Sequence, residues 1–413
     1  MSKNKRRFIP LLVSIGVVVG ILLGSFFASH FAGNRLNIIN TSSNKINDLL
    51  HLVDDQYVDS VNIPDLVEKS MPGILAQLDP HSTYVSAKDV EASMQGLNGI
   101  FSGIGFQFPI YKDPFRIIQI VKGGPSESKG LQAGDCITAV DGKPFVGEVV
   151  TNDEVLKRLK GPKGSKVTLS IKRVGEKRIF NTTITRGDVP VKSIDAVYMA
   201  TPSIGYIRIT SFSSTTYPEF LAALARLNQS DFKGLVIDLR GNLGGYLDAA
   251  VKIANEFLPK GRLIVYTEGR KSPRHDYVSD GRGTYQNIPL VLLVDENTAS
   301  ASEILSGAIQ DNDRGTVVGR RTFGKGLVQE AIEFRDNSAR YYTPSGRCVQ
   351  KPYKPGDELD YQEDLLLRAK HGEYYNADSI RANGEKYKTR LGRIVYGGGG
   401  IIPDKFIPLD TIG

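Results

Sequence analysis

The chain has 413 residues, 40% of them hydrophobic and 23% charged, which allows two or three domains with separate cores and excludes extensive disorder. Residues 1–35 hold five of the 52 basic residues and none of the 45 acidic ones, so the formal net charge of +7 is concentrated at the N-terminus. The rest of the chain is nearly neutral, which excludes a basic nucleic-acid surface and a nucleic-acid partner.

An uncharged apolar run follows the N-terminal basic cluster and occupies residues 8–27. Twenty such residues can cross a bilayer as a helix, and the basic cluster keeps the preceding end in the cytoplasm. We therefore expect residues 1–32 to be a cytoplasmic stub and a single-pass signal-anchor in a bacterial inner membrane. A cleaved signal peptide is the alternative, and in both cases the body of the protein is extracytoplasmic, in the periplasm.

Residues 33–95 are predicted to be helical, because 46–58 and 63–78 carry apolar residues at helical spacing. The pair Asp79-Pro80 marks a stop and a turn. Residues 96–188 are predicted to form a β-rich module, since short β-branched runs alternate there with Gly, Pro and Asp turns. One helix is expected in this module, from Asn152 to Leu159.

Residues 189–350 alternate between strand and helix patterns. The strands are predicted at 204–212, 234–240, 289–296 and 316–321, and the helices at 215–228, 243–257 and 300–310. Continuous apolar strands separated by amphipathic helices predict an α/β core with both sheet faces covered. Residues 351–413 are polar and rich in Tyr and Lys, and we expect them to complete this core or to form oligomer contacts.

Two cysteines, Cys136 and Cys348, are too few for a disulfide framework and fall in different predicted domains. We expect two buried free thiols. No Cys or His cluster has the spacing of a metal site, so no metal or other cofactor is predicted.

Ser300 lies shortly after the strand 289–296, where the next helix opens. A hydroxyl at this position projects at the mouth of the sheet, close to orphan N–H groups of the first helical turn, including that of Ala301. Such donors can stabilise the oxyanion of a tetrahedral intermediate. The alternative is that Ser300 only caps the helix, which is a common role for serine.

A nucleophilic serine needs a base, and none of the five histidines lies in a recognisable motif. Lys325 is the candidate, in Thr322-Phe323-Gly324-Lys325-Gly326 directly after an apolar strand. Burial would have to lower its pKa from about 10.4, and the glycines allow close backbone packing around it. The alternative is an ordinary surface lysine.

A second glycine cluster, Gly241 to Gly245, joins the strand 234–240 to a helix. It lacks the Lys-Ser/Thr pair and the spacing of phosphate-binding loops. We interpret its backbone N–H groups as oxyanion donors.

The segment 297–329, with Ser-Ala-Ser-Glu and Phe-Gly-Lys-Gly, resembles the signature of the C-terminal processing peptidases, or tail-specific proteases. The resemblance implies that Ser300 is the nucleophile, that Lys325 is the general base, and that Gln329 holds this lysine. The related motif Asp238 to Gly245 implies an oxyanion donor at Gly244 or Gly245 beside Ala301. Further matches cover most of the chain after residue 32. They imply a crotonase-like α/β protease core, a PDZ domain inserted ahead of it, and helical and C-terminal segments that often mediate oligomerisation.

The β-rich module then resembles a PDZ domain. Gly103, Ile104, Gly105 and Phe106 match its carboxylate-binding loop, whose backbone N–H groups receive the end of a peptide chain. Apolar C-terminal residues are the expected ligands. Without the resemblance, these four residues would be interpreted as a tight turn into a strand.

Together these observations predict an extracytoplasmic, membrane-anchored serine endopeptidase that recognises substrate C-termini. The segment between Gln329 and Tyr341 is shorter than the hairpin we expect in relatives, which leaves a catalytically inactive PDZ scaffold as the alternative. A third reading, acyl transfer on a thioester, is disfavoured by the PDZ resemblance and by the export signal.

Overall fold

The computed structural model describes residues 33–87, 89–108, 115–145, 152–329, 340–356, 358–381 and 385–410. The chain divides into two compact units, Met1–Ile74 and Leu75–Gly413. Within the described ranges no helix has both the length and the apolar character needed to cross a bilayer. The predicted anchor, residues 8–27, lies outside those ranges.

The first unit contains two helices, α3 (Gly33–Gln56) and α4 (Ile63–Leu75). They confirm the predicted helical character of 46–58 and 63–78, although α4 ends three residues before the predicted boundary. After α4 the chain enters the Asp79 turn, where the Asp79 side chain accepts hydrogen bonds from the following backbone.

The β-rich module has its own core of buried aliphatic and aromatic side chains. Among the described residues its largest sheet has the order β5-β4-β6-β7, and two small sheets pair β1 with β8 and β2 with β3. The helix α6 (Asn152–Leu159) has the predicted bounds. The strands of the module are β1 (Ile100–Gly103), β2 (Phe106–Gln107), β3 (Gln119–Ile120), β4 (Cys136–Val140), β5 (Lys143–Pro144), β6 (Lys166–Lys172), β7 (Phe180–Thr185) and β8 (Gly187–Pro190). It also contains the 3-10 helix η1 (Glu127–Lys129), and α5 (Val90–Gln95) precedes it.

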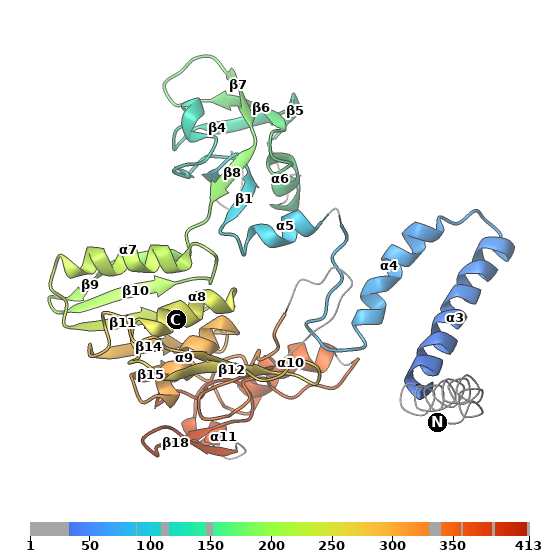
Figure 1. Ribbon diagram of the computed structural model, residues 1–413. Coiled ribbons are helices and arrows are strands. Elements are labelled where there is room, and N and C mark those ends of the chain that lie inside the picture. Colours follow the sequence, from blue (N-terminus) through green and yellow to red (C-terminus); the bar gives the residue numbers. More distant parts are fainter. Residues whose placement is uncertain are drawn as a thin grey trace, which may run out of the picture. The chain divides into compact units, whose positions relative to one another are not determined.

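The chain after the β-rich module is built on a sheet of six strands among the described residues, in the order β19-β15-β14-β11-β10-β9. Figure 1 labels β9, β10, β11, β14 and β15 of this sheet. All neighbouring strands are parallel except β9 and β10. The strands are β9 (Ile194–Thr201), β10 (Ile204–Ile209), β11 (Gly234–Asp238), β14 (Leu290–Val294), β15 (Thr316–Gly319) and β19 (Lys405–Phe406). The C-terminal strand β19 thus completes one edge of a sheet whose other strands end nearly ninety residues earlier.

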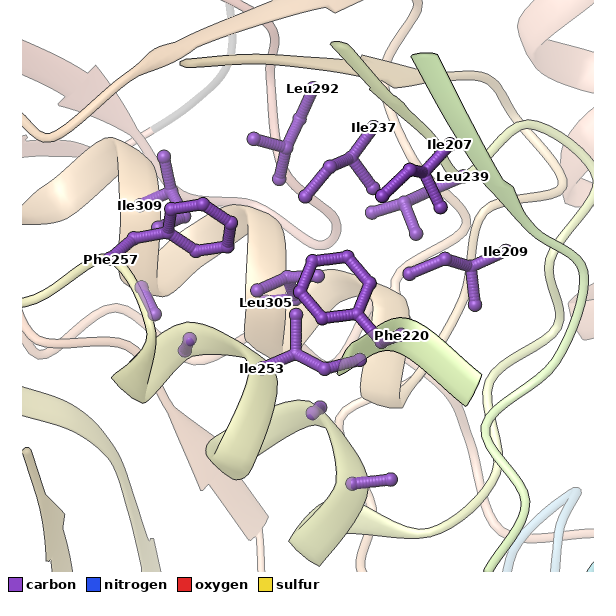
Figure 2. Packing of buried hydrophobic residues seen from close by; sticks show 14 of the residues in the cluster. Ile207, Ile209, Phe220, Ile237, Leu239, Ile253, Phe257, Leu292, Leu305 and Ile309 are labelled. Atoms are coloured by element: carbon purple, nitrogen blue, oxygen red, sulfur yellow. The ribbon is translucent and has the colours of Figure 1, made fainter. Parts of the chain in front are cut away.

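Three helices pack their apolar side chains against this sheet: α7 (Thr216–Asn228), α8 (Leu247–Asn255) and α9 (Ala301–Asp311). Figure 2 shows Phe220 of α7, Ile253 of α8 and Leu305 of α9 meeting the strand residues Ile207 and Ile237. Every residue of α9 is buried, so this helix lies inside the molecule. The core therefore fixes the helix that begins beside Ser300.

The opposite face of the sheet is covered less well than predicted. Along β10 and β14 buried residues alternate with half-buried or exposed ones, including Tyr206, Arg208 and Val291. For the described residues, the prediction that both faces are covered is therefore confirmed for the face under the helices and only in part for the opposite one. The apolar character of these strands concealed the alternation, because half-buried positions in β14 are also occupied by Val and Leu.

A smaller sheet has the strand order β13-β12-β16 and consists of β12 (Leu263–Glu268), β13 (His275–Val278) and β16 (Arg340–Tyr342). The remaining elements are α10 (Glu358–Lys370), α11 (Ala377–Arg381), β17 (Lys386–Lys388) and β18 (Ile394–Tyr396). Neither cysteine forms a disulfide, as predicted; Cys136 is buried as expected, whereas Cys348 is only half-buried. The segment predicted to be a shortened hairpin includes residues 330–339, which lie outside the described ranges.

Candidate active site

Ser300 occupies the N-cap position of α9 and is 8% exposed. Its backbone has φ 54° and ψ −116°, whereas N-cap residues typically adopt β-region angles. A non-glycine residue in this region is strained by about 1–3 kcal/mol, and such strain concentrates at functional sites. Helix capping alone does not require this conformation, which therefore favours a catalytic role.

The glycine cluster packs directly against Ser300. A Cβ added to Gly244 would lie 2.7 Å from Ser300 Cβ and 2.9 Å from Ala301 N. At Gly245, φ is 141° and an added Cβ would lie 2.0 Å from the carbonyl oxygen of Phe212. Only glycine fits at these two positions. They also explain why the helix predicted from residue 243 begins at Leu247, since positive φ angles interrupt a helix.

The backbone donors around Ser300 differ in availability. The N–H of Gly244 donates to Asn242 Oδ1 at 2.8 Å and is therefore occupied. Among the described residues, no acceptor is found for the N–H of Gly245 or of Ala301. Of the donors predicted from the sequence, Gly245 and Ala301 are thus the pair that can receive an oxyanion.

Glu303, on the first turn of α9, is fully buried and accepts four hydrogen bonds. Its Oε2 accepts from Ser300 N at 2.9 Å and from Lys325 N at 2.8 Å. Its Oε1 accepts from Thr322 Oγ1 at 2.5 Å and from Gly324 N at 2.8 Å. Burial raises the pKa of this carboxyl, and the hydrogen bonds oppose that shift because they favour the charged form. One side chain therefore fixes the backbones of Ser300 and Lys325 together.

Lys325 is half-buried, and its Nζ donates to Gln329 Oε1 at 2.6 Å. Burial lowers the pKa of the lysine, while the nearby Glu303 carboxylate opposes this shift. Within the described residues Nζ makes no hydrogen bond to the Ser300 hydroxyl. The structure thus brings Ser300, Lys325 and Gln329 to one locality and holds the ammonium on the glutamine.

The role of Glu303 was not predicted from the sequence, although the sequence contained a local pattern for it. Ser300 and Glu303 have the Ser-x-x-Glu spacing of a capping box, in which the glutamate accepts from the N-cap backbone. Its second function, binding the loop 322–325, depends on a contact between distant segments. Lys351, whose backbone N–H donates to Gly324 O at 2.8 Å, and Tyr361, whose ring centroid lies 5.9 Å from that of Phe323, also contact this loop and carried no local signal.

The predicted peptide-binding loop spans the end of β1 and the start of β2. Ile104 is 3% exposed, and both Ile104 and Phe106 belong to the core of the β-rich module. Their side chains hold the loop in place, so contact with a peptide there would come from backbone groups. Among the described residues, no acceptor is found for the N–H of Ile104 or Gly105.

No group of three or more His, Cys, Asp or Glu residues in the described part of the chain could hold a metal ion. The site described above consists of protein groups: a hydroxyl, an amine, an amide, a carboxylate and backbone donors.

Two family profiles match the chain: Peptidase family S41 at residues 203–359 and PDZ domain at residues 116–173. A protein of Bartonella bacilliformis named carboxy-terminal-processing protease is 34% identical over 74% of this chain and 72% of its own length. A Staphylococcus aureus protein named "Probable CtpA-like serine protease" is 32% identical over 86% of this chain and 72% of its own length. The solved structure of a photosystem II D1 C-terminal processing protease is 28% identical, covers 74% of this chain and 89% of that chain, and gives a TM-score of 0.41. The chain therefore belongs to peptidase family S41 and is a serine protease of the C-terminal processing type, with a PDZ domain.

Proposed function

We propose that Ser300 and Lys325 form the catalytic dyad of this protease. Neutral Lys325 takes the hydroxyl proton of Ser300 as Oγ attacks the peptide carbonyl, and the C–O bond forms. The oxyanion accepts hydrogen bonds from Gly245 N and Ala301 N. Protonated Lys325 then gives its proton to the leaving amine as the C–N bond breaks. Water, deprotonated by the same amine, hydrolyses the acyl-enzyme.

The observation that carries this proposal is the Glu303 carboxylate, which binds Ser300 N and Lys325 N through the same oxygen. Two segments separated by more than twenty residues are thereby held on one rigid group. Gln329 Oε1 accepts one N–H of Lys325, which leaves the lone pair of the neutral amine for the serine proton. Burial of Lys325 favours this neutral form.

We propose further that the PDZ domain captures protein or peptide substrates with apolar C-termini through backbone donors of Gly103, Ile104, Gly105 and Phe106. The charge-free run of residues 8–27 supports a single-pass anchor in a bacterial inner membrane, with the catalytic domain in the periplasm. The exposed apolar residues of α3 and α10, such as Leu49 and Leu366, are consistent with a homo-oligomer.

The dyad is tested with a serine-reactive probe and an unfolded casein-like substrate. Ser300→Ala is expected to abolish both probe labelling and cleavage, while Ser302→Ala, the neighbouring buried serine, keeps labelling at Ser300. Cleavage by Ser300→Ala at the wild-type rate would disprove the assignment. Wild-type protein that binds the substrate without cleaving it would instead support the alternative of a catalytically inactive PDZ scaffold.

A further inference from the structure

The side-chain amide of Gln329 has two partners, and only one belongs to the dyad. Its Oε1 accepts from Lys325 Nζ at 2.6 Å, while its Nε2 donates to the backbone carbonyl of His81 at 2.7 Å. His81 lies 248 residues earlier, in the turn that follows α4. The position of the amide that holds the base is therefore set by a distant turn.

We propose that the turn 79–82, fastened by His81 to Tyr361, is a positioning element of the catalytic site that holds Gln329 and, through it, Lys325. This inference rests on the proposed dyad and deepens it. The residues of the turn act through Gln329 and touch neither the substrate nor the reacting atoms.

Hydrogen bonds within the turn 79–82 fix the direction of the His81 carbonyl group. Asp79 Oδ1 accepts from the backbone N–H of His81 at 2.8 Å and from that of Ser82 at 2.9 Å. Asp79 Oδ2 accepts from Ser82 Oγ at 2.5 Å, and Pro80 restricts φ between these groups. An aspartate that binds the N–H two residues ahead stabilises such a turn. The His81 carbonyl therefore has little freedom to leave Gln329.

The imidazole of His81 fastens the turn to α10. Its Nε2 and the Tyr361 hydroxyl lie 2.8 Å apart, and the two rings are perpendicular with centroids 5.1 Å apart. Burial, followed by the positive charge of Lys325, lowers the pKa of His81 to about 4, so the ring is neutral at neutral pH. The Tyr361 hydroxyl accepts from Gln350 Nε2 at 3.2 Å, which leaves its own hydrogen for His81 Nε2.

The same hydrogen-bond network also contacts the loop that carries Lys325, through Gln350. Gln350 Oε1 accepts from the backbone N–H of Gly326 at 2.9 Å, next to Lys325. The connections thus form a closed path from Gly326 through Gln350, Tyr361, His81 and Gln329 to the Lys325 amine. Closure matters because a ring of hydrogen bonds restricts the amine from both the backbone side and the side-chain side.

A double-mutant cycle with Gln329→Ala separates positioning from a merely structural role. Tyr361→Phe removes one oxygen and keeps the ring, and we expect kcat to fall roughly three- to tenfold with KM changed less than twofold. In the Gln329→Ala background, Tyr361→Phe should cause no further loss, because both changes interrupt the same path. His81→Leu should behave likewise, and His81→Gln, which restores an acceptor, should recover most of the activity.

Tyr217→Phe is the matched control, since it also removes a half-buried hydroxyl. That hydroxyl donates to Glu256 at 2.7 Å and takes no part in the path to Lys325. It should leave kcat unchanged. All variants are measured as full-length protein with a peptide substrate, and thermal melting is recorded for each.

Losses that add to that of Gln329→Ala, or an unchanged kcat in Tyr361→Phe and His81→Leu, would overturn the proposal. If Ser300→Ala and Lys325→Ala abolish cleavage while Tyr361→Phe behaves like Tyr217→Phe, the positioning role fails and the dyad stands. If those two alanine variants remain active, the dyad itself fails.

Discussion

Lys325 lies in the loop 322–326 and is half-buried, and Lys351 is fully buried and donates its backbone N–H to Gly324 O of the same loop at 2.8 Å. The Lys351 side chain is 2% exposed, and its Nζ donates to Tyr361 O at 2.9 Å and to Asp364 Oδ2 at 3.0 Å. It also lies over the rings of Phe323 and Tyr361, at 4.1 Å and 3.9 Å from their centroids. Lys325 Nζ has a neutral amide, Gln329, as its acceptor.

The difference between the two lysines fits the base role that we propose for Lys325. Burial lowers the pKa of both lysines, but at Lys351 the ion pair with Asp364 opposes the shift, and the aromatic faces also favour a positive charge. At Lys325 the nearest carboxylate, Glu303, is already bound to four donors. Lys325 Nζ therefore has no carboxylate hydrogen-bond partner among the described residues to hold its proton, whereas Lys351 has one.

The largest expected effect separates the two lysines by activity. Lys325→Met should lower kcat/KM by roughly a thousandfold or more, because the general base is lost. Lys351→Met should lower it less than tenfold per folded molecule. Hydrolysis of a peptide substrate, normalised to the folded fraction, measures both. Equal losses in the two variants would contradict the distinction.

Giving Lys325 a carboxylate partner should make it resemble Lys351. Gln329→Glu places a negative charge at the amine, which favours its charged form and raises its pKa. Wild-type activity should rise with pH as Lys325 deprotonates, with a midpoint below the ordinary lysine pKa of 10.5. In the variant this rise should move to higher pH, so that activity at pH 7 falls roughly ten- to hundredfold and recovers in alkaline solution.

Gln329→Met is the control for this comparison. It also removes the amide donor to His81 but adds no charge, so its rise of activity with pH should not move upward. An identical pH profile for the glutamate and methionine variants would show that charge at this position does not govern the base.

Lys351 should matter for stability. Removing one partner of a buried ion pair is costly, but Asp364 keeps its contact with Arg368 at 2.9 Å. We therefore expect Lys351→Met to lower the free energy of unfolding by about 1–3 kcal/mol, measured from the urea midpoint of the protease core. An unchanged midpoint would mean that the pair contributes no net stability.

The smallest expected effect is a pH-dependent loss in Asp364→Asn, of about 1 kcal/mol at pH 7. Removing Asp364 lowers the folded-state pKa of Lys351 further, so the unfolded chain binds more protons below the ordinary lysine pKa. The stability loss should therefore shrink as pH rises toward 10.5, apart from a constant part due to Arg368. A loss of the same size at pH 7 and pH 10 would contradict the assignment.

Much of the fold could be predicted from local patterns. The bounds of α6 were predicted as they occur, and α7, α9, β11 and β14 were placed within a few residues. The strands β9 and β12 were not predicted, and β19 was not either. A two-residue strand such as β19 has no periodicity of its own and exists because it pairs with β15.

The site could be predicted where residues carry a motif. Ser300, Lys325, Gln329 and the glycine pair stood out, and they lie together in the structure. The choice of Gly245 over Gly244 as the free donor depended on the Asn242 side chain, whose direction no pattern reveals.

By itself, the sequence determined the family and singled out the residues that we propose for the chemistry, because these depend on local periodicity and on short motifs. The tertiary structure alone decided that Lys325, unlike Lys351, donates to an amide and not to a carboxylate, which glycine N–H is free, and that His81 reaches Gln329. These properties depend on contacts between segments tens to hundreds of residues apart, and hydrogen bonds and desolvation are set by such contacts rather than by neighbours along the chain.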